Sequence, residues 1–346
     1  MAPSSSPHRG AALPAPRGPL TEQLLWHLQR ATHEMAVLPL SDRIDPWSDD
    51  DAALALHLCY ELHYRGLPAV DTGWEWEPTL LRERRRLEVA FECALRAQIA
   101  SSSAELTPPV AAAELRRLAA GDDGPSLSGY MAERGTAEEM REFAIHRSAY
   151  QLKEADPHTW AIPRLTGRSK AALVDIQIGE YGEGRPDAVH ATLFAKAMEE
   201  LGLSSSYGRY VSLLPAATLA TGNLASMFGL HRRWRGALVG HLALFEMCSV
   251  GPMGRYAAAL RRLGFVDGPA LRFYEAHVIA DARHQVVAIE DLVGGLLASE
   301  PRLASDVVFG AQALAAVEER FATHLLECWS TGRSSLLAGH LTIDAA

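Results

Sequence analysis

The segment FYEAHVIADARH places three side chains that bind metal ions on one face of an expected helix. An α-helix advances about 100° per residue, so His277, Asp281 and His284, at positions i, i+4 and i+7, project within about 60° of one another. Two imidazoles and a carboxylate in such a row suit iron, manganese or zinc. The alternative is a polar helix face with two hydrogen-bonded histidines, and this segment alone leaves both interpretations open.

A carboxylate also stands inside the most apolar stretch, GALVGHLALFEMCSV. Burying an isolated charge is costly, so Glu246 must be paired, protonated or bound to a metal. Two interpretations remain: a structural carboxylate paired with an arginine such as Arg255, or a metal ligand.

A third segment, GEYGEGRPDAVHATLF, carries Glu180 at the expected end of one helix and His190 in the first turns of the next. Taken alone, these are an ordinary helix terminus and an ordinary histidine. The neighbouring Glu183 is expected to face solvent.

Together, the three segments supply carboxylates and histidines from separate helices within apolar sequence. A pair of irons in a helical bundle requires such a set, with bridging carboxylates and terminal histidines on facing helices. The ferritin-like version uses two Glu-x-x-His motifs, which this sequence lacks where they would be expected, so that version is disfavoured.

The order Glu–x9–His, isolated Glu, His–x3–Asp–x2–His resembles the ligand pattern of the haem-oxygenase-like di-iron oxidases and oxygenases, the "iron-containing redox enzyme" family. The flanking residues EYG.G.....H..LF and FY..HV.AD..H are also similar to that family, and the resemblance spans about 140–335. It implies a haem-oxygenase-like bundle of about seven core helices that binds two Fe(II) ions in place of haem and uses O2 as co-substrate.

The resemblance also implies roles for individual residues. Glu246 and Asp281 are expected to bridge or terminate the irons, the three histidines to be terminal ligands, and Glu180 to complete the set. A further Glu of the family matches Glu154 in YQLKEADPHTW, for which a surface position at a helix end is the alternative. The family's labile site implies that the 269–297 helix loosens without metal.

The implied reaction is O2-dependent oxidation of a small organic substrate: N-oxygenation of an amine, or oxidative C–C cleavage or desaturation of an amino or fatty acid. An external electron donor and a homodimer are compatible with it. The alternatives are a metal-free, thiaminase-like member of the same superfamily with a catalytic cysteine, and a non-catalytic metal-binding bundle that serves as a partner protein.

Nearly every ordered stretch reads as helix, because Ala, Leu, Arg and Glu dominate and β-branched residues seldom alternate with polar ones. The fold class is therefore all-α. His57, Glu61 and His63 in HLCYELHY are interpreted as packing and solvent residues. The expected division of the chain is a disordered tail (1–20), an N-terminal helical extension (21–105), a linker (106–134), the di-iron domain (135–335) and a C-terminal tail (336–346).

Composition excludes several classes of partner. The chain has 346 residues, 48% hydrophobic and 22% charged, with a formal charge of −9, which argues against nucleic acid and anionic membranes. The longest apolar run is interrupted by His241 and Glu246, so no membrane span is expected. Four scattered cysteines without a CxxC pair fit a reducing cytoplasm, where we expect the protein to act.

Overall fold

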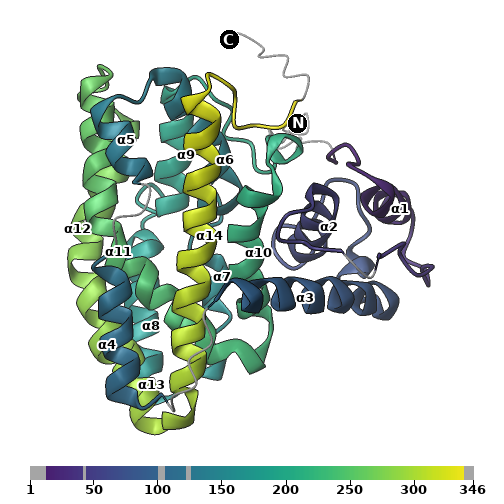
Figure 1. The fold of residues 1–346 in the computed structure, drawn as a ribbon, viewed down its shortest axis with the longest axis horizontal. Coiled ribbons are helices and arrows are strands. Elements are labelled where there is room, and N and C mark those ends of the chain that lie inside the picture. The colour runs from purple at the N-terminus through teal and green to yellow at the C-terminus, as the bar shows by residue number, and fades with distance from the viewer. Residues whose placement is uncertain (1–12, 42–43, 100–105, 122–125, 339–346) are drawn as a thin grey trace, which may run out of the picture.

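The computed structural model describes residues 13–41, 44–99, 106–121 and 126–338, and every regular element among them is helical (Figure 1). The predicted all-α fold class is confirmed. The predicted tails lie largely outside the described residues, which begin at Leu13 and end at residue 338.

Three N-terminal helices lie beside a taller bundle (Figure 1). They are α1 (Pro19–Leu28), α2 (Asp50–Glu61) and α3 (Pro78–Gln98). The side chain of Asp49 caps α2 by accepting from the backbone amides of Asp51 and Ala52. Helix α1 ends at Leu28, and side chains elsewhere bind the backbone beyond it: Met35 N–H, for example, donates to Thr79 Oγ1.

The bundle is formed by the later helices, which run from residue 137 to residue 330. They are α6 (Ala137–Gln151), α7 (Asp156–Thr159), α8 (Gly167–Glu180), α9 (His190–Glu200), α10 (Ala216–Leu230), α11 (Arg235–Arg262), α12 (Pro269–Val286), α13 (Gly294–Ser299) and α14 (Ala304–Ser330). A π-helix, Val287–Val293, joins α12 to α13. Short 3-10 turns cover Thr72–Trp76, Ile162–Arg164, Gly182–Gly184, Val211–Leu213, Arg232–Trp234 and Pro301–Leu303.

The segment interpreted as a linker contains two helices that cover the bundle. They are α4 (Pro108–Ala119) and α5 (Leu127–Glu133), and both pack against α11 and α14. Leu115 and Met131 are fully buried in these contacts. The apolar side chains of this segment therefore contribute to the core, although its Gly- and Pro-rich punctuation suggested a connection.

The centre of the bundle is α11, which packs most extensively against α12 and α14. Although proline favours a helix break, α11 continues through Pro252. Packing on both sides outweighs the one backbone hydrogen bond that proline removes. Helices α11 and α14 approach so closely at Gly240 that a Cβ there would lie 1.8 Å from the carbonyl oxygen of Val307.

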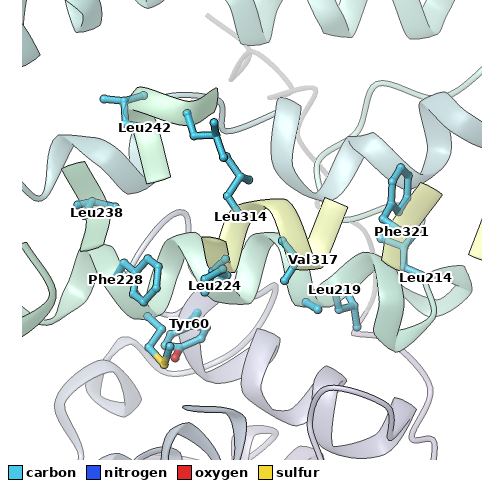
Figure 2. Packing of buried hydrophobic residues seen from close by; sticks show 14 of the residues in the cluster. Tyr60, Leu214, Leu219, Leu224, Phe228, Leu238, Leu242, Leu314, Val317 and Phe321 are labelled. Atoms are coloured by element: carbon cyan, nitrogen blue, oxygen red, sulfur yellow. The ribbon is translucent and has the colours of Figure 1, made fainter. Parts of the chain in front are cut away.

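The N-terminal helices and the bundle share one hydrophobic core. In Figure 2, Tyr60 of α2 lies beside Phe228 and Leu224 of α10, and Val317 of α14 lies close to α10. Helix α10 is therefore sandwiched between the N-terminal helices and the rest of the bundle.

The helix with its preceding turn, Arg232–Arg262, is long and apolar enough to cross a membrane by length and composition. In the structure, 67% of its apolar window is buried inside the protein. Its apolar character is thus explained by its position at the centre of the core.

Candidate metal centre

Five elements bring the seven candidate ligands to one buried region of the bundle. Glu180 is the last residue of α8 and His190 the first of α9, Glu246 lies in α11, and the turn after α6 carries Glu154. Helix α12 carries His277, Asp281 and His284. All seven are between 2% and 7% exposed: Glu154, Glu180, His190, Glu246, His277, Asp281 and His284. Glu154 is therefore not a surface residue.

The first group of ligand atoms comes from Glu154, Glu180, His190 and His277, and all lie within 4.8 Å of one another. Nδ1 of His190 is 2.7 Å from Oε2 of Glu180, and Nε2 of His277 is 3.4 Å from Oε2 of Glu154. The two imidazole rings lie 4.2 Å apart, centroid to centroid.

The second group comes from Glu180, Glu246, Asp281 and His284, within the same 4.8 Å limit. Nδ1 of His284 lies at its centre, 3.3 Å from Oε2 of Glu246, 3.5 Å from Oε1 of Glu180 and 3.6 Å from Oδ1 of Asp281. Glu180 belongs to both groups and offers one oxygen to each.

The chain reversal between α8 and α9 depends on backbone conformations that favour glycine. Gly182 has φ 64°, and a Cβ there would lie 2.5 Å from the backbone of Val189. This turn brings His190 back against Glu180. Glu183, within the turn, is 71% exposed at its side chain, as expected.

Neighbouring groups orient the ligands. Nδ1 of His277 donates to the carbonyl oxygen of Phe273 at 2.9 Å, which leaves Nε2, the nitrogen that faces Glu154, available to hold a metal ion. The hydroxyl of Ser249 donates to Oδ2 of Asp281. Such partners fix ring orientation and carboxylate geometry in metal sites.

The alternative of a structural Glu246–Arg255 pair is wrong. Arg255 is exposed, and its Nε donates to Ser128 Oγ at 2.8 Å. Glu246 instead faces other ionisable groups, and its burial together with the charges of Glu180 and Asp281 raises its pKa to about 8.

The remaining charges of the centre are strongly coupled. Burial alone raises the pKa of Glu180, but His190 and His284 bring it well below its usual value. Burial lowers the pKa of the two α12 histidines, yet the carboxylates override it: Glu154 and Glu180 raise the pKa of His277 to about 10, and Asp281, Glu180 and Glu246 raise that of His284 to about 11. A cation at this site would replace those protons.

The residues suit a pair of metal ions in two respects: the types of their donor atoms and the incomplete hydrogen bonding of those atoms. Four buried atoms here face ionisable partners at 2.7–3.6 Å but make no well-directed hydrogen bond among the described residues: Glu154 Oε2, His190 Nδ1, His277 Nε2 and His284 Nδ1. Buried polar atoms without a directed hydrogen bond are rare and call for an explanation such as an ion. Mixed imidazole and carboxylate donors suit iron.

Two cavities adjoin the centre. A small one of about 10 Å³ lies among the ligands and reaches His158 and Gln177. A larger one of about 430 Å³ lies between α6, α11 and α14 under α4 and α5. Tyr150 and Phe245 line both cavities and therefore separate the large cavity from the ligands.

The wall of the large cavity is mainly apolar and aromatic, with a few polar groups. Tyr150, Tyr256 and Tyr274 line it, and buried Oε1 of Gln151 has no hydrogen-bond partner among the described residues. Sequence reasoning missed Tyr150, Gln151 and Ser249. Helical spacing was an available signal, since Ser249 stands three residues after Glu246.

The sequence was compared with known proteins. The pattern of the family described as "iron-containing redox enzyme" matches residues 141–319, which is just over half of the chain. A nitrosourea synthase from Streptomyces achromogenes subsp. streptozoticus is 28% identical over 146 residues, or 42% of this chain. The match spans only 31% of that protein. The buried ligand groups lie within the matched residues, and the fold is a haem-oxygenase-like helical bundle. The chain belongs to the family of iron-containing redox enzymes.

Proposed function

We propose that this protein is a non-haem di-iron enzyme that activates O2 to oxidise a small organic substrate. The observation that carries the proposal is the pair of buried ligand groups that share Glu180. A carboxylate common to two such groups is the usual bridge in di-iron bundles.

In this proposal, Glu180 would contribute to both iron positions. Glu154, His190 and His277 would hold one iron, and Glu246, Asp281 and His284 would hold the other. The sequence-based expectation was that Glu246 and Asp281 bridge or terminate the irons and that Glu180 completes the set. When bound as Fe(II), two irons supply the electrons and the open coordination positions that O2 activation requires.

The substrate would lie in the 430 Å³ cavity, whose volume suits a small organic molecule. Its apolar wall would exclude water, while Gln151 and the tyrosine hydroxyls would orient the polar groups of the substrate. Burial and the charges of Glu154, Glu180 and Glu246 raise the pKa of Tyr150 well above its usual value. Its hydroxyl therefore keeps its proton and serves as a donor at the boundary of the two cavities.

Among the substrates that the sequence suggested, an amine or amino acid is favoured over a fatty acid. A nitrosourea carries an oxidised nitrogen, so the name of the relative supports N-oxygenation. The unpaired acceptor Oε1 of Gln151 also matches an N–H donor. We further propose an external electron donor and a cytoplasmic location.

The thiaminase-like alternative requires a nucleophilic cysteine. Cys248 lines the large cavity, but burial raises its pKa to about 11, so its thiol is protonated at neutral pH. Cys59 is buried outside that cavity, with a pKa raised by burial to about 12. Neither thiol has the electropositive surroundings that activate a nucleophile.

Anaerobic titration with Fe(II), followed by O2-consumption assays with amines, amino acids and fatty acids, tests the proposal. We expect two irons per chain, and O2 uptake that one substrate class stimulates. A chain that binds fewer than two irons, or that binds two without any O2 uptake, would contradict it. The second of these outcomes would support the metal-binding partner protein instead.

A further inference from the structure

Two adjacent residues in the turn after α6 enter different buried clusters. Glu154 faces the metal centre, with Oε2 3.4 Å from Nε2 of His277. Lys153 is 1% exposed, and its ammonium forms an ion pair with Glu61 at the end of α2. The N-terminal helices therefore contact the chain one residue away from a candidate ligand.

The surroundings of Glu61 keep it ionised beside that ammonium. It is 3% exposed, accepts a hydrogen bond from the hydroxyl of Tyr207, and lies 3.8 Å from Nε2 of His57. Burial alone raises its pKa, but the charge of Lys153 lowers the pKa below its usual value, so Glu61 is a carboxylate. The ammonium also lies 4.1 Å from the ring centroid of Tyr64.

The backbone of the same turn is held from both sides. Arg65, four residues after Glu61, donates to the carbonyl oxygen of Leu152 at 2.7 Å. On the other side, Nε2 of Gln177 in α8 donates to the carbonyl oxygen of Ala155 at 3.3 Å. Ala155 has φ 72°, a left-handed conformation that costs a non-glycine residue energy and persists only where surrounding contacts impose it.

A buried lysine requires its partner. Removing one member of a buried ion pair leaves an uncompensated charge, which is strongly unfavourable, whereas replacing both members by apolar residues of similar volume is often neutral. Without the Glu61 carboxylate, the Lys153 ammonium would move toward water. That movement would displace Glu154, since the two residues share a peptide bond.

We propose that the N-terminal helices position the metal centre, with Glu61 and Arg65 acting as positioning residues that hold the Leu152–Ala155 turn and so keep Glu154 in its ligand group. The inference rests on the proposed di-iron function. It gives a role to residues 13–98, which lie outside the part of the chain that matches the family.

The test compares Glu61→Gln with the wild type by anaerobic Fe(II) titration of the full chain. We expect two irons in the wild type, whereas in Glu61→Gln the affinity for one of the two falls roughly tenfold or more, as it does when a supporting residue of a metal site is lost. The double variant Glu61→Leu/Lys153→Met removes both charges and should recover binding to within a few fold. The backbone amide of Asp156 donates to the backbone carbonyl oxygen of Lys153 at 3.1 Å. In the metal-free proteins, hydrogen exchange at this amide should be faster in the single variant only.

Glu88→Gln is the matched control. Glu88 is fully buried in α3 and accepts from the hydroxyl of Tyr60 and, at 2.8 Å, from Nε2 of His231, so it also joins the N-terminal helices to the bundle. It does not contact the Leu152–Ala155 turn, and we expect Glu88→Gln to bind both irons as the wild type does.

The outcomes separate the two hypotheses. A wild-type chain that binds fewer than two irons overturns the proposed function, and this inference with it. A wild type that binds two irons, with Glu61→Gln matching it, overturns the inference alone. Equal losses in Glu61→Gln and Glu88→Gln would also overturn it, because they would indicate general destabilisation rather than positioning of Glu154.

Discussion

Gly179 of α8 leaves the space that the imidazole of His284 in α12 occupies. A Cβ built on Gly179 would lie 2.7 Å from Nε2 and 2.8 Å from Cε1 of that ring, closer than real Cβ contacts allow. The ring faces α8 with Nε2, while Nδ1 faces Glu180, Glu246 and Asp281. The absence of a side chain at position 179 therefore leaves room for the His284 ring to lie within the second ligand group.

We expect Gly179→Ala to weaken iron binding. The added methyl group must push the His284 ring away from α8 and out of line with its three carboxylates. Affinity for one iron should fall roughly tenfold or more, in the range seen when ligand orientation is disturbed. Anaerobic Fe(II) titration measures the loss, and circular dichroism of the metal-free variant checks that the fold is kept.

Gly222→Ala is a suitable control for that variant. Gly222 lies within α10, and a Cβ there would meet nothing within 4 Å. Alanine is the better helix former, so this variant should be at least as stable as the wild type and bind iron equally. Normal iron binding by Gly179→Ala would show that His284 tolerates the displacement.

Glu180→Gln and Glu154→Gln should differ in how much iron they lose. Glu180 belongs to both ligand groups, whereas Glu154 belongs to one. We expect the Glu180 variant to lose tight binding of both irons and the Glu154 variant to keep one. The bound iron per chain, counted after anaerobic desalting, checks this prediction, and equal losses in the two variants would contradict a shared role for Glu180.

The sequence predicted the parts of the centre that depend on local periodicity. The row of three on α12 follows from helical spacing alone, and the structure brings His277, Asp281 and His284 into the two groups as one helix face. The sharing of Glu180 could not be predicted in this way, because it depends on how α8 lies against α12 and where α9 returns. These are long-range packing relationships, to which a single sequence gives little access.

Glu154 and α11 show the same limit. The burial of Glu154 results from a left-handed turn at Ala155 and from the contacts of Leu152 with Arg65 and of Lys153 with Glu61, more than 85 residues earlier in the chain. Helix α11 continues through Pro252 because its neighbours pack along both sides of it. Local propensity left a surface glutamate open and favours a helix break at a proline, and tertiary contacts overrode both.

Acid should destabilise the metal-free protein through its buried neutral histidines. Burial lowers the pKa of His57 to about 4 and that of His241 to about 3, against about 6.5 in an unfolded chain. The unfolded state therefore binds more protons below pH 6.5, and the stability due to these groups, complete above pH 6.5, is lost as the pH falls toward 4 and 3. The raised pKa values of Glu246, His277 and His284 act in the opposite direction in the metal-free protein, so urea unfolding between pH 7.5 and 5 must compare the wild type with a variant that lacks the buried neutral histidines.

The pair His158 and His241 offers a way to isolate this effect. Nε2 of His158 and Nδ1 of His241 form a hydrogen bond of 3.0 Å, and both residues are buried. The double variant His158→Phe/His241→Phe removes both titrating groups without leaving either one unpaired. As the pH falls from 7.5 to 5, its unfolding midpoint should fall less, or rise more, than that of the wild type, and parallel curves would contradict the assignment.

Gln151→Leu should impair substrate binding without affecting iron. Gln151 lines the large cavity, is 5% exposed, and its Oε1 has no hydrogen-bond partner among the described residues. Leucine keeps the volume but removes the acceptor, so a substrate that donates an N–H group there should bind roughly tenfold more weakly, the effect of about one hydrogen bond. We expect two irons per chain, as in the wild type, and a raised KM in the O2-consumption assay. An unchanged KM would exclude contact between Gln151 and the substrate, whereas loss of iron would show that this side chain instead supports the nearby Glu154.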